Sequence, residues 1–178
     1  MRICLDTETT GLDPAGGDEI LQLSIVDSDT KQVIFDKYFK PEHKTEWVDA
    51  ARVNQITPEM VKDCKPIREY YTDIQSIFDN AEEIIGYNTK FDLGFLEITA
   101  GIAPLKSVKI VDVMQEYAEC YGEWDAKNNR YKWVKLVDAG NHFGFDWDQY
   151  QAHNSLSDVF ATIHVYDAMR SPDPILIF

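Results

Sequence analysis

The chain has 178 residues, and its 17 Lys and Arg against 31 Asp and Glu give a formal net charge of −14 at pH 7. This length predicts one domain over residues 1–178, and the negative charge excludes a protein whose average surface attracts phosphate or anionic lipid. The three cysteines form no Cys-x-x-Cys pair, which argues against a disulfide framework and a zinc knuckle and favours a reducing, cytoplasmic location. No apolar stretch reaches the roughly 18 residues of a membrane span, so no membrane association is expected.

Short segments rich in Ile, Val and Phe dominate the N-terminal part of the chain. Residues 2–8, 20–27 and 32–39 have this composition and are separated by turn-forming stretches. Such runs are typical of β-strands, and short turns between them favour antiparallel pairing. The sequence therefore predicts a three-strand antiparallel meander.

The pattern changes to helices and isolated strands after residue 46. Short helices are expected at 47–54 and 57–62, and a longer one at 66–78. Apolar residues recur at helical spacing in the longer helix and predict one buried face: Ile67, Tyr70, Tyr71, Ile74, Ile77 and Phe78. Strands are expected at 83–87 and 108–111, and helices at 89–100, 113–121, 133–143 and 155–169. The order indicates an α/β fold in which parallel strands extend the meander into a mixed sheet flanked by helices.

The first acidic motif is Asp6-Thr7-Glu8. Side chains two apart in a strand point the same way, so Asp6 and Glu8 place both carboxylates on one face and Thr7 on the other. Neighbouring carboxylates repel each other unless a cation lies between them, and Mg²⁺ accepts such oxygen ligands. Taken alone, the motif has a polar strand end as its alternative. The turn at 9–11 adds a glycine that lets the backbone approach a ligand closely.

The second acidic motif lies where a predicted strand meets a predicted helix. Asn88 is suited to cap the helix, and Asp92 falls in its first turns, where the helix dipole favours a carboxylate. Capping alone explains Asn88 better than Asp92, because Asp92 lies among apolar residues expected in the core. A buried carboxylate needs a charged partner, and a metal ion would be one.

The third motif runs from His153 to Asp158. Ser155, with Asp158 three residues on, is typical of a helix start, which places His153 in the loop just before the helix. This spacing brings an imidazole near a carboxylate, and an imidazole can take a proton from water at neutral pH. A lone histidine is usually structural or exposed, but the spacing to Asp158 favours a catalytic interpretation here.

The three motifs together resemble those of the DEDDh exonuclease family, which includes the proofreading subunit of bacterial DNA polymerase III and ribonuclease T. The matching residues are Leu5-Asp6-Thr7-Glu8-Thr9-Thr10-Gly11-Leu12, then Asn88-x-x-Phe91-Asp92, then His153 with Asp158. The resemblance implies a ribonuclease H-like fold and one exonuclease domain. It also implies that Asp6, Glu8, Asp92 and Asp158 bind two Mg²⁺ or Mn²⁺ ions and that His153 is the general base. The implied reaction is 3′→5′ removal of nucleoside 5′-monophosphates, for which a pair of metal ions is well suited.

The same resemblance suggests which residues seat the terminal nucleotide. Thr9 and Leu12 follow the first motif, and Tyr87 and Asn88 occupy positions that touch the nucleotide in family members. Asn54 lies in Val53-Asn54-Gln55-Ile56-Thr57, where the family usually has Val-His-Gly-Ile-Thr. This departure leaves the catalytic set intact but affects any transfer of substrate preference.

The stretch at 123–133 departs from the short family members by interleaving basic and aromatic residues. In an acidic chain this composition favours contacts with a single strand by stacking and phosphate attraction. The alternative is a solvated loop whose Trp124 and Trp133 cover the edge of the core. The apolar residues 174–178 are expected to pack on the domain, with docking to a sliding clamp as the alternative.

Two functional classes follow from these motifs. The first is an active exonuclease on nucleic acid 3′ ends, with single strands preferred because a chain of charge −14 should hold long duplexes poorly. The second is a non-catalytic module of a replication or repair assembly that contains a polymerase or clamp. A nucleotide phosphatase using the same ions is a third. Retention of all five catalytic-type residues favours the exonuclease, since a binding module has no need for four clustered carboxylates.

Overall fold

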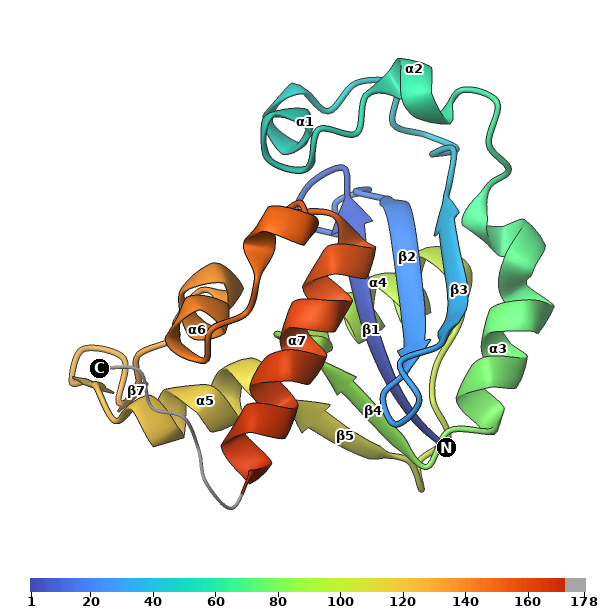
Figure 1. Ribbon diagram of the computed structural model, residues 1–178. Helices are drawn as coiled ribbons and strands as arrows, with labels where there is room; N and C mark the ends of the chain where they lie inside the picture. The colour runs from blue at the N-terminus through green and yellow to red at the C-terminus, as the bar shows by residue number, and fades with distance from the viewer. Residues whose placement is uncertain (172–178) are drawn as a thin grey trace.

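A computed structural model describes residues 1–171, and a mixed sheet forms its centre (Figure 1). The strands within this part of the chain are β1 (Arg2–Thr9), β2 (Ile20–Asp27), β3 (Val33–Tyr38), β4 (Glu83–Gly86) and β5 (Lys109–Asp112), and their order is β3-β2-β1-β4-β5. Antiparallel pairs join β3, β2 and β1, whereas β4 and β5 run parallel to β1. The predicted meander and its parallel extension are confirmed.

Helices cover both faces of this sheet. These helices are α3 (Tyr71–Asp79), α4 (Thr89–Ala100), α5 (Val113–Tyr121), α6 (Leu136–His142) and α7 (Ser155–Arg170), whereas α1 (Val48–Asn54) and α2 (Pro58–Val61) lie beyond one end of the sheet (Figure 1). Two single turns of 3₁₀ helix are Ile67–Tyr70 and Trp147–Gln149. None of the helices in residues 1–171 is both long enough and apolar enough to cross a membrane.

Strand alternation divides the core into two layers. Ile3 and Leu5 of β1 pack with α3 and α4, whereas Cys4, on the opposite face, packs with α5, α6 and α7. Both layers are buried at the centre of the sheet, so β1 and β2 are buried along most of their length. The α7 layer is the one that matters for the acidic motifs, because Asp6 and Glu8 have the same strand parity as Cys4.

The prediction of a single helix at 66–78 is wrong. Its first turn is the 3₁₀ segment Ile67–Tyr70, and α3 begins only at Tyr71. A 3₁₀ turn has three residues per turn instead of 3.6, so the apolar face shifts in phase. Tyr71, predicted to be buried, is consequently 45% exposed, while Ile74 and Phe78 are buried as expected.

The helix predicted at 133–143 also differs, because α6 begins at Leu136. Upstream of it the chain forms a small hairpin of β6 (Trp124–Asp125) and β7 (Arg130–Tyr131), which the sequence analysis missed. The Asp125 carboxylate accepts hydrogen bonds from the backbone N–H groups of Lys127 and Asn128 at 3.1 and 3.2 Å and so closes the turn. Strands of two residues are too short to produce a detectable alternation.

The amino end of α7 is fixed by polar residues of β2. Asn154, and not Ser155, caps the helix, because its side chain accepts the N–H of Ser157 at 3.4 Å. Ser155 is the first helical residue and is fully buried, with its hydroxyl 2.6 Å from that of Ser24. Since the Ser24 hydroxyl donates to Asp36 at 2.9 Å, Ser155 must be the donor to Ser24.

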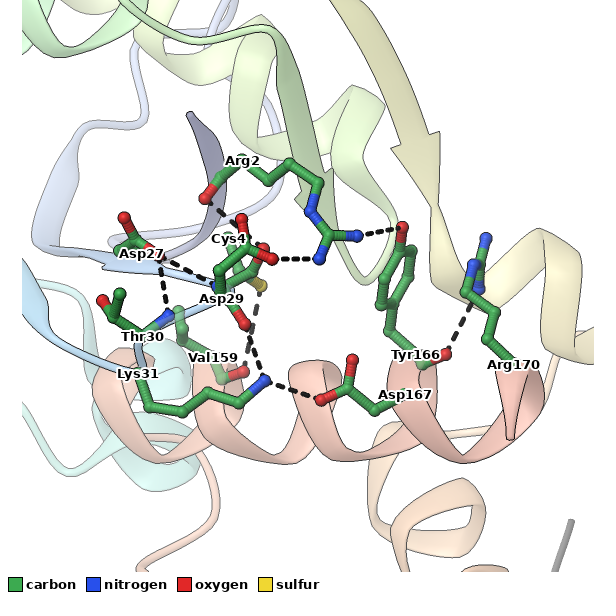
Figure 2. Close-up of polar contacts among 11 residues, drawn as sticks. Arg2, Cys4, Asp27, Asp29, Thr30, Lys31, Val159, Tyr166, Asp167 and Arg170 are labelled. Carbon is green, nitrogen blue, oxygen red and sulfur yellow. Dashed lines mark hydrogen bonds and ion pairs between the residues drawn. The ribbon is translucent and has the colours of Figure 1, made fainter. Parts of the chain in front are cut away.

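Further along α7, polar contacts hold the helix against β1 and the turn between β2 and β3 (Figure 2). The Cys4 thiol donates to the Val159 carbonyl at 3.8 Å, and Lys31 donates to Asp167 at 2.6 Å. Arg2 contacts the Tyr166 hydroxyl at 3.5 Å. These contacts fix the position of α7 along the sheet. They therefore also fix where Asp158 lies relative to β1.

We expect Ser24→Ala to lower the free energy of unfolding by about 1–3 kcal/mol, because it leaves the buried Ser155 hydroxyl without an acceptor. Denaturant unfolding measures this change. Ser76→Ala, at an exposed site on α3, is the matched control and should stay within about 0.5 kcal/mol of the parent. Equal stability of the two variants would contradict the role given to the serine pair.

Candidate active site

Three carboxylates meet at the carboxyl end of β1, beneath the start of α7. Asp6 and Glu8 lie on the same strand face, and in the antiparallel register they are opposite Ser24 and Gln22, the residues that hold the end of α7. Asp158, in the first turn of α7, is thereby brought to them. One carboxylate oxygen each from Asp6, Glu8 and Asp158 lies within 4.8 Å of the other two. The predicted convergence of the first and third motifs is confirmed.

Asp92 lies outside this group of three but is held at the same part of β1 and repels Asp6. The ladder between β1 and β4 includes Cys4 but no later residue of β1, so it leaves the N–H of Thr7 available. Asp92, on the first turn of α4, accepts that N–H at 3.0 Å and the Thr7 hydroxyl at 2.6 Å. Asp92 is 2% exposed, and Thr7 is the residue that holds it there. Strand alternation predicts that Thr7 points away from Asp6 and Glu8, but the contact with Asp92 could not be predicted from the sequence.

Burial and crowding of these carboxylates oppose their ionisation. Burial, then repulsion from Asp92, Asp158 and Glu8, holds the pKa of Asp6 well above its usual range. Burial and the repulsion of Asp158 raise the pKa of Glu8 to about 8, although a hydrogen bond from Asn54 opposes the shift. Four carboxylates therefore cannot all be charged at neutral pH without a compensating positive charge.

The remaining two acids show how the protein partly offsets this cost. Burial raises the pKa of Asp92 to about 7 despite the two hydrogen bonds from Thr7. Burial likewise raises the pKa of Asp158 to about 7, and the backbone N–H of His153 opposes the rise. The offset is incomplete in both cases, and only a cation would complete it.

The donor set fits a hard divalent cation. All four side chains offer carboxylate oxygens, the ligands that Mg²⁺ and Mn²⁺ prefer. The nearest thiol belongs to Cys4, which points to the same face but donates to Val159 and is fully buried. Zinc sites of the structural type need nitrogen or sulfur ligands, which are absent from this group of four. The chemistry of the donor set therefore fits a divalent cation.

His153 lies beside this group, but the contact is made by its backbone. It has a positive φ of 61°, which turns its N–H toward the Asp158 carboxylate, and its side chain is exposed. The sequence predicted that the imidazole would lie near the carboxylate. In the structure the backbone of His153 anchors the loop at Asp158, and the imidazole faces solvent. The residue adjoins Asp158 through its backbone, and its exposed imidazole is open to a bound substrate.

A cavity of about 600 Å³ opens next to Glu8 and contains three of the predicted nucleotide-seating residues. Thr9, Leu12 and Asn54 line it, and Leu12 is 83% exposed at its rim. Tyr87 and Asn88 do not belong to its lining. The Tyr87 hydroxyl donates instead to the Val134 carbonyl at 2.8 Å, and the Asn88 N–H donates to Asp112 at 3.1 Å.

Asn88 also differs from the expected cap. It occupies the N-cap position of α4, but its backbone is left-handed, with φ 69°, and its side chain makes no capping hydrogen bond. The left-handed conformation is one that Asn tolerates better than most residues. This conformation, and not side-chain capping, is what the position requires.

The Asn54-Gln55 pair has a structural explanation. The Asn54 amide donates to the Thr9 carbonyl at 3.2 Å and its oxygen accepts the Ile56 N–H at 3.1 Å, so Asn54 ties α1 to the end of β1. Gln55 ends α1 with φ 61°, a conformation that favours glycine. The left-handed backbone at position 55 explains why the family usually has glycine there. Asn54 is explained by its position beside Glu8 and Thr9.

Several cavity residues were missed by the sequence analysis. Trp47, Val53 and Phe91 provide apolar walls, and Lys44 provides a cation that also pairs with Asp18 at 2.9 Å. Phe91 could have been found, because it immediately precedes Asp92 in the second motif. Lys44 lies in a loop, and Trp47 lies at the start of α1. The positions of both depend on tertiary packing.

Because the raised carboxylate pKa values mean that the metal-free folded state binds protons more tightly than the unfolded chain, its stability should fall as the pH rises from about 4 to about 8. Between pH 6 and pH 8 we expect a fall of several kcal/mol in the presence of a chelator. Thermal unfolding measures it, and Mg²⁺ should restore more stability at pH 8 than at pH 6. Glu8→Gln should flatten the dependence, and an unchanged profile in that variant would contradict the explanation.

The comparisons with known proteins agree with this geometry. Residues 3–166 match the exonuclease family RNase T. The uncharacterized exonuclease CP81 of Escherichia phage 186 is 31% identical over 176 residues, which cover 94% of this chain and 87% of that protein. DNA polymerase III subunit epsilon of Rickettsia felis is 32% identical over 114 residues, which cover 62% of this chain and 49% of that protein.

Solved structures share the fold. The zinc-bound complex of E. coli ExoI with single-stranded DNA has a TM-score of 0.73 at 23% identity, over 96% of this chain and 41% of that chain. Exonuclease X in complex with 5′ overhanging duplex DNA has a TM-score of 0.66 at 19% identity, over 97% of this chain and 93% of that chain. The expected ribonuclease H-like fold is confirmed, and this chain spans less than half of the ExoI chain. With its family matched over residues 3–166, the chain belongs to the RNase T family of exonucleases.

Proposed function

We propose that this exonuclease is a metal-dependent 3′→5′ enzyme of the DEDDh type, which releases nucleoside 5′-monophosphates from single-stranded nucleic acid. The observation that carries the proposal is the convergence of Asp6, Glu8 and Asp158 within 4.8 Å, with Asp92 buried beside Asp6. Residues 1–178 would act as one exonuclease domain. Free thiols at all three cysteines support a cytoplasmic location.

In this proposal Asp6, Glu8, Asp92 and Asp158 hold two divalent cations, Mg²⁺ or Mn²⁺. When bound, these ions supply the positive charge that makes a water molecule acidic and stabilises the leaving 3′ oxygen. The carboxylates contribute by position. Thr7 fixes Asp92, and the β2 serine contact fixes the helix that carries Asp158, so the ligands are placed before substrate arrives.

His153 is the proposed general base. The water oxygen attacks phosphorus as its proton passes to the imidazole, and the bond from phosphorus to the 3′ oxygen of the preceding nucleotide breaks. That 3′ oxygen then takes a proton from solvent, which leaves a 3′-hydroxyl on the shortened strand. The exposed side chain of His153, on a loop anchored to Asp158, supports this assignment because it can approach a water near the acids.

The cavity beside Glu8 is the proposed seat of the terminal nucleotide. Thr9, Leu12 and Asn54 would contact it, and its apolar walls suit a base while its open side suits the rest of the strand. Tyr87 and Asn88 are proposed to border the scissile phosphate from the start of α4. The ExoI complex contains single-stranded DNA, which supports a single-stranded substrate, and the epsilon relative supports a replication or repair setting with a polymerase or clamp partner.

Asp92→Asn should reduce kcat/KM by at least about 100-fold, because it removes one ligand charge from the cation site. A 5′-labelled single-stranded oligonucleotide with Mg²⁺ or Mn²⁺ should give a ladder that shortens from the 3′ end and disappears with a chelator. Asp73→Asn, at an exposed site on α3, is the matched control and should leave the ladder unchanged. An oligonucleotide left intact by the parent protein with either metal would sink the proposal.

His153→Gln should lower kcat by about 10²- to 10⁴-fold while metal affinity changes little, because it removes the base and leaves the ligands in place. Asp6→Asn should instead weaken metal binding as well. Titration of activity against Mn²⁺ concentration separates the two effects. Equal losses of metal affinity in both variants would contradict the roles assigned to these residues.

A further inference from the structure

The segment of residues 123–135, called here the aromatic hairpin, differs in charge from the rest of the chain. It contains four Lys or Arg and two Asp or Glu, which gives a local charge of +2 in a chain of −14. Figure 1 shows the hairpin at the end of α5 and next to α6. Because the average surface repels phosphate, a local cationic segment is where a polyanion would be held.

The aromatic side chains of this hairpin are exposed. Trp124 is 53% exposed, Tyr131 38% and Trp133 47%, so a large part of each ring is open to a ligand. Trp124 and Tyr131 lie across the two short strands with ring centroids 5.3 Å apart and planes at 86°. The hairpin pairing and this contact hold the rings in fixed positions, which lowers the entropic cost of stacking a ligand on them.

The cations of the hairpin lie among these rings. The Arg130 guanidinium lies 3.2 Å from the centroid of the Trp133 ring, and its buried Nε has no hydrogen-bond partner within residues 1–171. Lys132 is paired with Glu123 at 3.0 Å, whereas Lys127 and Lys135 are exposed. The two exposed ammonium groups of Lys127 and Lys135 provide donors for phosphate oxygens.

Two hollows adjoin the hairpin. One of about 280 Å³ lies against α5 and is lined by Trp124, Arg130, Tyr131 and Trp133. The other, of about 430 Å³, lies toward α6 and includes Trp133, Lys132 and Lys135. Trp133 borders both, so a chain of stacked groups could use both sides of the hairpin.

One hydrogen bond connects the hairpin to the residue that precedes the second acidic motif. Its last residues lead to α6, and the Val134 carbonyl accepts the Tyr87 hydroxyl at 2.8 Å. Tyr87 follows β4 and immediately precedes Asn88 and the helix that carries Asp92. Val134 and Tyr87 therefore link the hairpin to the segment that leads into α4.

From these observations we infer that the aromatic hairpin binds the single-stranded part of the nucleic acid that lies 5′ to the cleaved end. Bases stack on Trp124, Tyr131 and Trp133, and phosphates pair with the free cations. Stacking on aromatic rings tolerates every base, so this surface would hold the strand without reading its sequence. The inference rests on the proposed nuclease function, because it makes the hairpin a second contact with the same substrate.

Binding of a fluorescent 20-nucleotide single strand, measured by anisotropy with a chelator present, tests the inference without cleavage. Trp124→Ala combined with Trp133→Ala should weaken binding at least fivefold. Tyr71→Ala, an equally exposed aromatic on α3, is the control and should change binding less than twofold. Because the double tryptophan variant alters the hairpin fold as well, a second variant is needed.

The second variant is Lys127→Ala combined with Lys135→Ala, which removes two exposed charges and leaves the rings in place. The slope of log affinity against log salt should become shallower by about 1.4, since each lost phosphate contact contributes about 0.7. Lys62→Ala combined with Lys106→Ala removes the same charge elsewhere and should leave the slope unchanged.

A cleavage assay on the parent protein distinguishes failure of the hairpin inference from failure of the nuclease proposal. If the parent protein shortens the strand but both hairpin variants bind it as tightly as their controls, the hairpin inference is overturned and the nuclease proposal stands. If the parent protein cleaves nothing and the variants still bind more weakly than their controls, the nuclease proposal fails and the hairpin remains a single-strand binding surface.

Discussion

The mutual repulsion of four buried carboxylates at the end of β1 is the constraint on which the rest of the structure depends. Asp6, Glu8, Asp92 and Asp158 come from one strand and two helices. Burial raises the pKa of each one, and repulsion from the other acids adds to the rise for Asp6 and Glu8. Such an arrangement persists only if surrounding contacts hold the acids in place. The burial and repulsion that raise these pKa values destabilise the ionised acids in the metal-free fold. The same interactions give the site its affinity for a cation.

Those surrounding contacts explain several otherwise unusual features. The early end of β4 frees the Thr7 N–H for Asp92, and the polar residues Gln22 and Ser24, buried in the middle of an apolar strand, hold the start of α7. Asn54 ties α1 to the same end of β1. Each element that borders the site is thus attached to β1 or β2 by a side-chain hydrogen bond in addition to apolar packing.

The sequence was sufficient to predict what depends on local pattern. Strand alternation placed Asp6 and Glu8 on one face, and the bounds predicted for α4 and α5 agree with the structure. It could not predict contacts between distant segments, such as the serine pair that spans 131 positions or the bond between Thr7 and Asp92. The aromatic hairpin was missed because strands of two residues carry no periodic signal, and residues 174–178, with the clamp-docking alternative, lie outside the described part of the chain.

The central claim is that the four carboxylates form one site for a pair of divalent cations. Isothermal titration with Mn²⁺ at pH 6.5, in two buffers of different ionisation enthalpy, tests it most directly. The account predicts two ions per chain and a net release of protons on binding, because the acids with raised pKa must ionise as the ions enter. Two results would contradict it. In one, no ion binds; in the other, ions bind without proton release and bind equally well to Asp92→Asn.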